Sequence, residues 1–503
     1  MFKTIFILLL TVFTTAYASQ SSRVDTMQGL EISHSSSLSQ SSSVFLGRAG
    51  FYDPSDILIF PHLSNKYSDF VNIYYGGGNN YGGFGTFEMM KGLTLGIADF
   101  SVVKTLDGLE NVNLNDFQGN DVQPLSTHKY SAFLAYGLSN MSFGLSFNYW
   151  GFKHRLIQNT QDTTNNKINT ASRTADSGIY SFNASFGMKI NDIMGFDAMI
   201  KTDFGTFTNE VYDTTANPKT KIITSPESYL MLSIGGRYFL DLTSRLKITA
   251  WLFFDYNKQE YKDIDYTTEE KKYDKNSHLN SGKTTNIGIS FDINSFNNKV
   301  KVKPQIGFLF ISNNLEKESL SVPDKGSKTK AETSLNMLPY IGISSEYEIK
   351  KWLTIYTGYS KIITTNNIKL YNLAKNNGDT TANTSQEYES SNKFSNFSIG
   401  LSLQNEDLKF IATMNKNLII NGPNFISGTN TPMFLNATIQ YSFGAPAQKL
   451  KPQSTENFTP VKKQEVKKLE KVTENPVKKE EENLNYTDDT ETTDDTEIDE
   501  DIE

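Results

Sequence analysis

The feature that most constrains this chain is an alternation of apolar and polar residues in stretches of about ten. The last stretch spans residues 433–443, and its apolar set is Met433, Leu435, Ala437, Ile439, Tyr441 and Phe443. A period of two places alternate residues on opposite faces of a β-strand. A tilted strand needs roughly 9–11 residues to cross a membrane. One such stretch also fits a soluble sandwich, but its recurrence along most of the chain favours a transmembrane barrel.

The repeated pattern predicts an all-β fold, a transmembrane antiparallel up-and-down β-barrel of about 16 strands, with 14 also possible. An apolar content of 37% and a mean hydropathy of −0.43 exclude a bundle of transmembrane helices. The predicted strands are residues 69–75, 81–90, 93–103, 128–138, 141–152, 177–190, 194–205, 228–241, 245–257, 284–294, 301–312, 335–348, 352–363, 394–404, 407–416 and 433–443.

The connections between these strands alternate in length. Short turns follow one end of each strand pair, whereas residues 158–177, 259–283 and 364–393 form long connections rich in Asn, Thr, Asp, Lys and Ser. Outer-membrane barrels have short periplasmic turns and long external loops. We therefore expect the long polar segments to be external loops, and an even number of strands places both chain ends in the periplasm.

The two ends of the chain lie outside the predicted barrel, residues 69–443. Residues 1–18 read as a signal peptide, with Lys3, an apolar run over 5–13 and the small-residue site Ala16-Tyr17-Ala18, so we expect cleavage before Ser19. Residues 19–68 are Ser-rich and are expected to form a flexible arm or a plug inside the barrel. The chain has no cysteine, which excludes a lipoprotein anchor, disulfides and thiolate metal sites.

Residues 444–503 are expected to be a disordered charged tail in the periplasm. Nine Lys oppose seventeen Asp and Glu after residue 448, which accounts for the entire formal net charge of −8. The tail has too few apolar residues to bury a core. It would tether the barrel to peptidoglycan or a periplasmic partner, or remain a solvated tail without one. The balanced charge elsewhere excludes nucleic acid as a partner.

Four short motifs near the N-terminus carry a family resemblance. They are Arg23-Val24-Asp25-Thr26-Met27-Gln28-Gly29, Gly47-Arg48-Ala49-Gly50, Asp53-Pro54-Ser55-Asp56 and Phe60-Pro61-His62-Leu63. The segment resembles the start of outer-membrane barrels related to the long-chain fatty-acid transporters (FadL-like) and to the PorV/PorQ-type barrels. Gln28 and Pro61-His62-Leu63 depart from the usual pattern. The first resemblance implies a hydrophobic-solute channel, and the second implies a platform in a secretion complex.

The closing strand resembles the C-terminal signal by which such barrels are recognised for insertion. The residues at the signal positions are Leu435, Ala437, Ile439, Tyr441 and Phe443. The resemblance implies outer-membrane lipid and the barrel-insertion machinery as partners. The sixty residues that follow Phe443 depart from barrels in which the chain stops there.

The face opposite the apolar set is expected to line the lumen. Its charged candidates are Asp197, Lys201, Asp203, Arg237, Lys247, Asp255, Asp292, Lys303, Glu346 and Lys409, with Gln305 beside them. Charges of both signs fit a wet channel that acts on a permeating solute, and they also fit ion pairs that block it. A partly apolar interior is an alternative, because large apolar residues occupy other inward positions: Phe133, Met199, Trp251, Phe253, Leu309 and Ile311.

No motif in the sequence indicates catalysis, a metal or a cofactor. The five histidines, His34, His62, His128, His154 and His278, have no metal-ligand spacing. Glycines 76–78 and 82–85 fit a hairpin better than a phosphate loop, because no Lys-Ser/Thr follows them. We therefore expect a non-enzymatic outer-membrane protein that transports an unknown small solute passively, as a porin-like or hydrophobic-solute channel. The alternative is a barrel platform or anchor in an envelope complex.

Overall fold

The computed structural model describes residues 50–76, 80–102, 127–162, 167–213, 220–268, 271–295, 298–320, 326–376, 379–414 and 434–443. The predicted signal peptide, the Ser-rich arm up to residue 49 and the charged tail lie outside the described residues. Among the described residues, no helix is long and apolar enough to cross a membrane.

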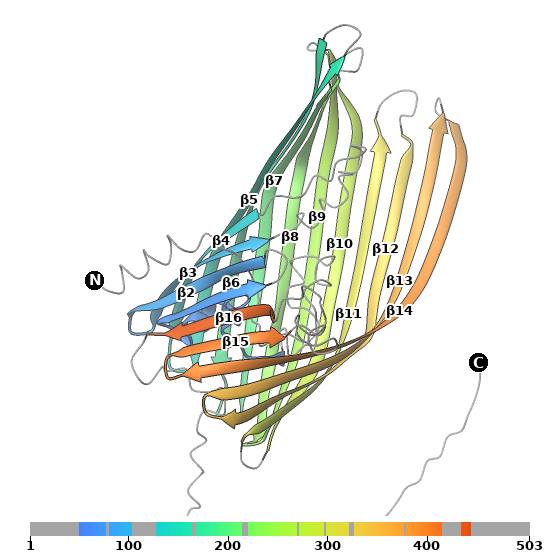
Figure 1. Cartoon of the computed structure of the whole chain (residues 1–503). Helices are drawn as coiled ribbons and strands as arrows, with labels where there is room; N and C mark the ends of the chain where they lie inside the picture. Colours follow the sequence, from blue (N-terminus) through green and yellow to red (C-terminus); the bar gives the residue numbers. More distant parts are fainter. Residues whose placement is uncertain are drawn as a thin grey trace, which may run out of the picture. The chain divides into compact units, whose positions relative to one another are not determined.

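Sixteen antiparallel strands form a closed barrel (Figure 1). Each strand pairs with the next along the chain, and β1 pairs with β16 from Phe70↔Ser442 to Gly76↔Asn436 to close the sheet. The predicted fold class is therefore confirmed. The strands are β1 (Phe70–Gly76), β2 (Asn80–Met90), β3 (Leu93–Val102), β4 (Thr127–Gly137), β5 (Met141–Asp162), β6 (Lys167–Lys189), β7 (Met194–Asp213), β8 (Thr220–Thr243), β9 (Leu246–Thr268), β10 (Lys271–Asn294), β11 (Val300–Ser319), β12 (Lys328–Lys350), β13 (Leu353–Asn376), β14 (Asp379–Asn405), β15 (Leu408–Met414) and β16 (Phe434–Ser442).

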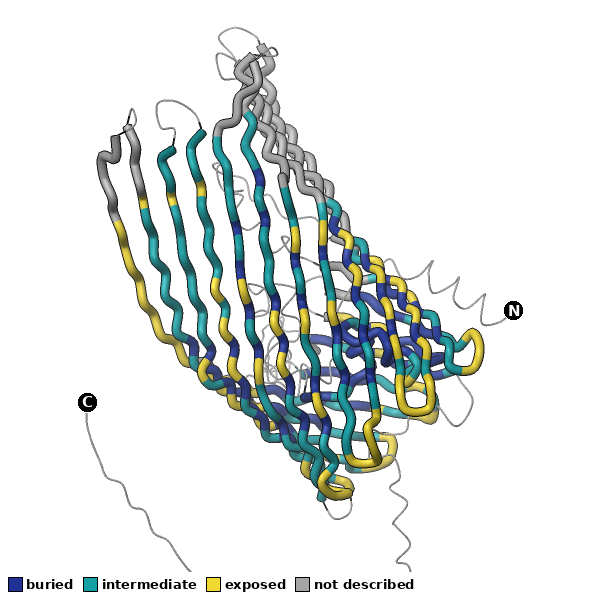
Figure 2. Tube along the Cα trace, turned by 180° about the vertical axis from the view of Figure 1, so that it is seen from behind, coloured by how far each residue is buried: buried dark blue, intermediate teal, exposed yellow. Residues whose placement is uncertain are grey.

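The side chains divide between the two faces as the alternation predicts (Figure 2). Ile439 is 44% exposed on the outer face, whereas Thr438 and Gln440 beside it are at most 2% exposed. Tyr441 and Phe443 stack with ring centroids 6.2 Å apart, and the Phe443 backbone N–H donates to the Asp69 carbonyl at 2.9 Å. The outward apolar residues form a belt around the short-turn end of the strands, and their members include Ile234, Leu252, Ile287, Ile343 and Phe397, each 44–54% exposed.

The expectation of long external loops is wrong for all three segments. Pairing continues to Asp162↔Lys167 in β5–β6, to Thr268↔Lys271 in β9–β10 and to Asn376↔Asp379 in β13–β14. These residues extend the strands beyond the apolar belt. Neither face of such an extension is apolar, so the period of two disappears from the sequence although the backbone ladder continues.

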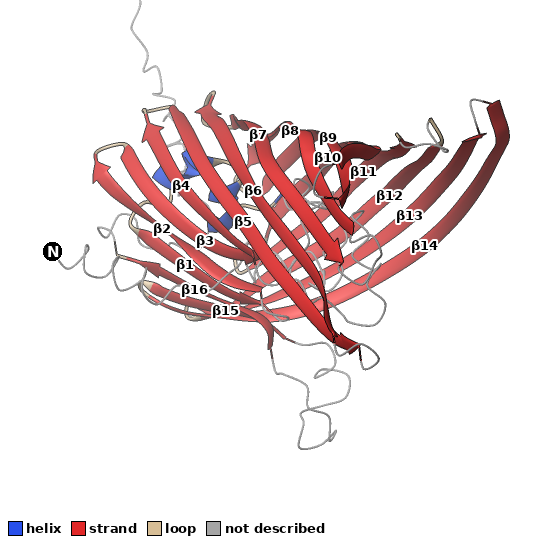
Figure 3. Ribbon diagram, turned by 90° about the horizontal axis from the view of Figure 1, so that it is seen from above, coloured by secondary structure: helices blue, strands red, loops and turns tan. Residues whose placement is uncertain are grey.

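The barrel wall is much taller on one side than on the other (Figures 1 and 3). Strands β5–β14 contain between 20 and 27 residues each. Strands β15, β16 and β1–β4 contain only 7–11. The tall wall extends beyond the belt, where the outward face of β9 changes from Phe254 and Tyr256 to Lys258, Glu260 and Lys262.

Residues 50–68, here called the plug, lie inside the barrel and contain two short 3₁₀ helices, η4 (Pro54–Leu58) and η5 (Pro61–Asn65) (Figure 3). The Asp53 carboxylate caps η4 by accepting from the Ser55 N–H at 3.0 Å, and Pro54 suits the first turn. Ile57 and Phe60, at most 1% exposed, pack in one apolar cluster with inward residues of the wall. The wall contributes Phe84, Phe133, Met199, Trp251 and Phe253 to this cluster.

Candidate functional site

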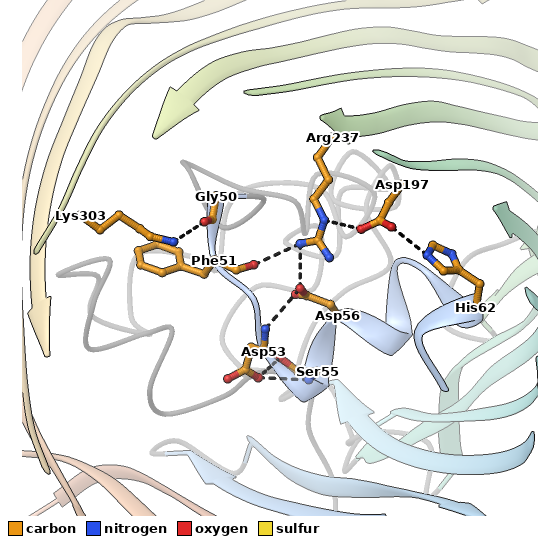
Figure 4. A network of polar contacts seen from close by, with 9 residues as sticks. All are labelled: Gly50, Phe51, Asp53, Ser55, Asp56, His62, Asp197, Arg237 and Lys303. Carbon is orange, nitrogen blue, oxygen red and sulfur yellow. Dashed lines mark hydrogen bonds and ion pairs between the residues drawn. The ribbon is translucent and has the colours of Figure 1, made fainter. Parts of the chain in front are cut away.

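Arg237 on β8 joins the barrel wall to the plug (Figure 4). Its Nε donates to Asp197 Oδ2 at 2.8 Å, and Asp197 is its partner in the β7–β8 ladder. Its Nη1 donates to two acceptors of the plug, Asp56 Oδ2 at 2.8 Å and the Phe51 carbonyl at 3.1 Å. The side chain is fully buried. A buried guanidinium keeps its charge only with such partners, so Arg237 binds one carboxylate from each side.

Aromatic rings enclose the Arg237 guanidinium. Its Cζ lies 4.5 Å from the ring centroid of Tyr52, 4.7 Å from that of Phe60 and 5.4 Å from that of Phe239. A cation over an aromatic face is stabilised most where water is excluded. Burial, followed by the nearby Asp197 carboxylate, raises the pKa of the Tyr52 hydroxyl well above its ordinary value, so this ring stays neutral.

His62 on η5 joins the plug to β6 and β7. Its Nε2 lies 2.9 Å from Asp197 Oδ1, and its Nδ1 lies 3.0 Å from Ser185 Oγ. The His62 backbone N–H also donates to Ser185 Oγ at 2.9 Å. Asp197 therefore binds Arg237 with one oxygen and His62 with the other, which makes it the shared acceptor of the network.

Lys303 on β11 holds the other end of the plug. Its Nζ lies 2.7 Å from Asp292 Oδ1 on β10 and donates to the Gly50 carbonyl. The same ammonium lies 4.6 Å from the Phe51 ring centroid. Together with Arg237 on β8, Lys303 on β11 fixes residues 50 and 51 against one part of the wall (Figure 4).

The remaining lumen candidates also lie on the inner face, and one of them, Lys247, reaches the plug. Lys201 Nζ pairs with Asp203 Oδ2 at 2.8 Å, and Lys247 Nζ lies 4.6 Å from the Tyr52 ring centroid. Asp255 is 8% exposed. Glu346 Oε2 is 3.9 Å from Lys301 Nζ, and Lys409 Nζ is 6.0 Å from the Tyr356 ring centroid. Of the ten charged candidates, the described contacts thus bring Asp197, Arg237, Lys247, Asp292 and Lys303 together at the plug.

The inward apolar candidates divide into two groups. Phe133, Met199, Trp251 and Phe253 pack on the plug. Leu309 forms a separate cluster on β11–β13 with Met337, Tyr340 and Ile362, and Ile311 packs against it. The interior is therefore partly apolar, as the sequence left open.

Two wall glycines allow the plug to approach this closely. A Cβ at Gly144 would lie 2.0 Å from the His62 backbone nitrogen, and a Cβ at Gly187 would lie 2.4 Å from His62 Nε2. No real Cβ tolerates such distances. An alanine at Gly144 would push the η5 backbone away from the wall, and an alanine at Gly187 would displace the His62 ring from its contacts. Polar patterning alone does not identify these two residues as part of the site.

We expect Gly144→Ala to loosen the plug. The natural chain lacks cysteine, so a single Ser64→Cys on buried η5 reports plug exposure by its maleimide labelling rate. Overpacking costs about 1–3 kcal/mol, which corresponds to labelling faster by about fivefold to 150-fold. Gly178→Ala is the matched control, because its Cβ would meet only the Tyr149 ring at 3.6 Å. Equal labelling in both variants would contradict the close contact at Gly144.

No protein-family model matches the chain, and no curated protein matches its sequence. Solved barrels similar to it include a Pseudomonas aeruginosa FadL homologue, with 9% identity over 86% of this chain and 100% of that one and a TM-score of 0.38. The Ralstonia pickettii toluene transporter TbuX has 11% identity over 70% and 97%, with a TM-score of 0.30. The Escherichia coli outer membrane protease OmpT has 9% identity over 61% and 97%, with a TM-score of 0.23.

TM-scores this low carry no argument about the fold. The assignment of a barrel therefore depends on the strand pairing of this chain. The resemblance to the FadL-like barrels is accordingly a loose one. Within the described ranges, no group of three or more His, Cys, Asp and Glu residues could hold a metal ion.

Proposed function

We propose that this protein is an outer-membrane transport barrel whose lumen is closed by the plug and opens when the plug moves. The apolar belt on the outer face supports a position in a membrane, and the polar inner face supports a path for a solute. The short turns would lie at the periplasmic rim and the tall wall outside the cell. The plug lies near the short-turn end, where it would gate the periplasmic exit.

The observation that carries this proposal is the way in which the plug is held. Arg237, Asn183 and Lys303 bind backbone carbonyls of the plug, at Phe51, Ile59 and Gly50, through their side chains. Each of these contacts can break without opening a strand ladder. The plug can therefore move while all sixteen strands stay paired, and a gated channel requires such a movement.

The purified, refolded protein in planar bilayers tests this proposal. We expect a small conductance with rare openings, because the buried ion pairs favour the docked plug. Liposomes that contain the protein should take up small solutes slowly. Heat-modifiable gel migration shows separately that the barrel has formed. A correctly folded barrel without any conductance steps or solute uptake would rule out transport.

The alternative is a platform or anchor in an envelope complex, and its periplasmic tether would be residues 444–503, which lie outside the described residues. Deleting residues 446–503 would test it through envelope fractionation and co-purified partners. If neither the fractionation nor the set of partners changes, the tether role of the tail loses its basis.

A further inference from the structure

The inner face of the tall wall carries a row of six paired positions beyond the apolar belt. The row, here called the amide row, runs across β9–β14 and consists of Asn257, Gly282, Asn313, Thr333, Ile368 and Tyr388. Neighbouring strands are about 4.8 Å apart, so six strands span roughly 24 Å. The row faces the barrel interior, because Thr284, Leu309, Met337, Ile362 and Ser398 at alternate positions on the same strands are buried.

The amide row contains no charged side chain, whereas the row on the opposite face of the same wall is mostly charged. That outward row consists of Lys258, Ser281, Asn314, Glu332, Lys369 and Glu387. Its charges form ion pairs with neighbours on the same face: Lys258–Glu260 at 2.8 Å, Lys330–Glu332 at 2.5 Å and Lys369–Glu387 at 3.0 Å. Contact with water explains the charged side chains of the outward row. If contact with water were the only requirement, charged side chains would be expected in the inner row as well. The amide row itself is therefore neutral and mostly polar.

Two amides of the row converge over a glycine. A Cβ at Gly282 would lie 2.4 Å from Asn313 Oδ1 and 2.8 Å from Asn257 Oδ1. Because Gly282 has no side chain, the amides of both neighbouring strands can occupy the space above it on β10. Both residues are only partly buried. Each amide offers donors and an acceptor in one plane. Adjacent amides of this kind suit a ligand with neighbouring hydroxyl groups.

An exposed aromatic ring ends the row. Tyr388 is 54% exposed, and its hydroxyl donates to Gln386 Oε1 at 2.9 Å, which fixes the ring on the inner face. Asn313 lies three strands away, or roughly 14 Å. A sugar has an apolar C–H face that packs on an aromatic ring and a rim of hydroxyls that bind amides. An anion would need the arginine or lysine that this row lacks.

We propose that the amide row binds a neutral oligosaccharide, with hydroxyl groups on Asn257 and Asn313 and a sugar face on Tyr388. The inference rests on the proposed function for the placement of the row outside the cell. There the row would collect the glycan that the barrel transports or to which the cell adheres.

Isothermal titration of the full-length refolded protein in detergent tests this inference with neutral hexasaccharides (malto-, cello- and chitohexaose) and with anionic hexagalacturonate. We expect saturable binding of at least one neutral hexasaccharide, with affinity at least about tenfold above that for the anion. Asn313→Ala should weaken binding by about tenfold, because a hydrogen bond in a partly enclosed site is lost. Tyr388→Ala should weaken it comparably.

Asn314→Ala is the matched control, because the same amide on the next residue faces outward and should leave affinity unchanged. The inference is overturned by equal losses in the Asn313 and Asn314 variants, by equal affinity for the anion, or by no saturable binding of any neutral hexasaccharide. Binding in detergent needs no transport, so a barrel that binds sugar but never conducts would defeat the proposed function alone.

Discussion

Replacing Arg237 with alanine is expected to turn a mostly closed barrel into a conducting one. The change removes three hydrogen bonds, to Asp197, Asp56 and the Phe51 carbonyl. It also leaves two buried carboxylates without their shared cation. Breaking a buried ion pair costs about 3–5 kcal/mol. Because the wall stays paired by its ladder, most of this cost falls on the docked plug, and the closed-to-open ratio should fall at least about a hundredfold.

Open probability in planar bilayers measures this effect. Arg245→Ala is the control, since Arg245 is an exposed arginine in the turn after β8. Arg237→Lys should open the barrel less than Arg237→Ala, because it keeps the charge and loses the fork that binds two carboxylates. Heat-modifiable migration identifies any variant that fails to fold. If folded Arg237→Ala barrels stay as closed as the Arg245 variant, the plug is held by something other than this network.

The sequence predicted the strands where one strand face meets an apolar environment. There the wall has water-filled or protein-filled space on one face and an apolar environment on the other, and the alternation follows from this difference, as at Ile439 and Thr438. It fails beyond the belt. Residues 158–177 and 364–393 are mostly polar on both faces, so their composition matches that of loops. The continued backbone pairing is what distinguishes them from loops.

The candidate site was predictable only in part. Periodicity alone places Asp197, Arg237 and Lys303 on the inner face. Their partners in the plug depend on contacts between distant segments, with 181 residues separating Asp56 from Arg237 and 135 separating His62 from Asp197. No local pattern specifies such a contact. Two features of the sequence could have indicated the plug contacts. They are the acidic turn that contains Asp53 and Asp56, and the glycines Gly144 and Gly187 at inward positions of the wall.

Of the two alternatives for the lumen charges, ion pairing describes the network at the plug. Asp197 and Lys303 belong to both sequence hypotheses, because a charge pair that holds a movable plug also lines the channel once the plug has moved. Under the proposed function, the ion pairs and the open channel would be two states of one lumen rather than competing structures.

A lysine at position 439 is expected to abolish accumulation of the barrel in the membrane. Ile439 is 44% exposed on the outward face of β16, within the belt and beside the closing pair with β1. A lysine on the lipid-facing surface near the bilayer midplane costs about 2–4 kcal/mol. The pairing of β16 with both β1 and β15 closes the barrel, so the cost falls on the step that completes insertion. Phe443→Ala should impair accumulation less severely, through loss of the stack on Tyr441.

The matched control is Ser391→Lys, an outward and exposed position on β14 beyond the belt, where lysine meets water and costs almost nothing. Membrane fractions and heat-modifiable migration compare the variants at equal expression. Both variants place a lysine on the outward face, so a difference between them reports the position of the residue relative to the membrane. If Ile439→Lys reaches the level of Ser391→Lys, the exposed apolar residues of β16 do not face lipid, and the belt defined by the strand alternation would have to be drawn elsewhere on the wall.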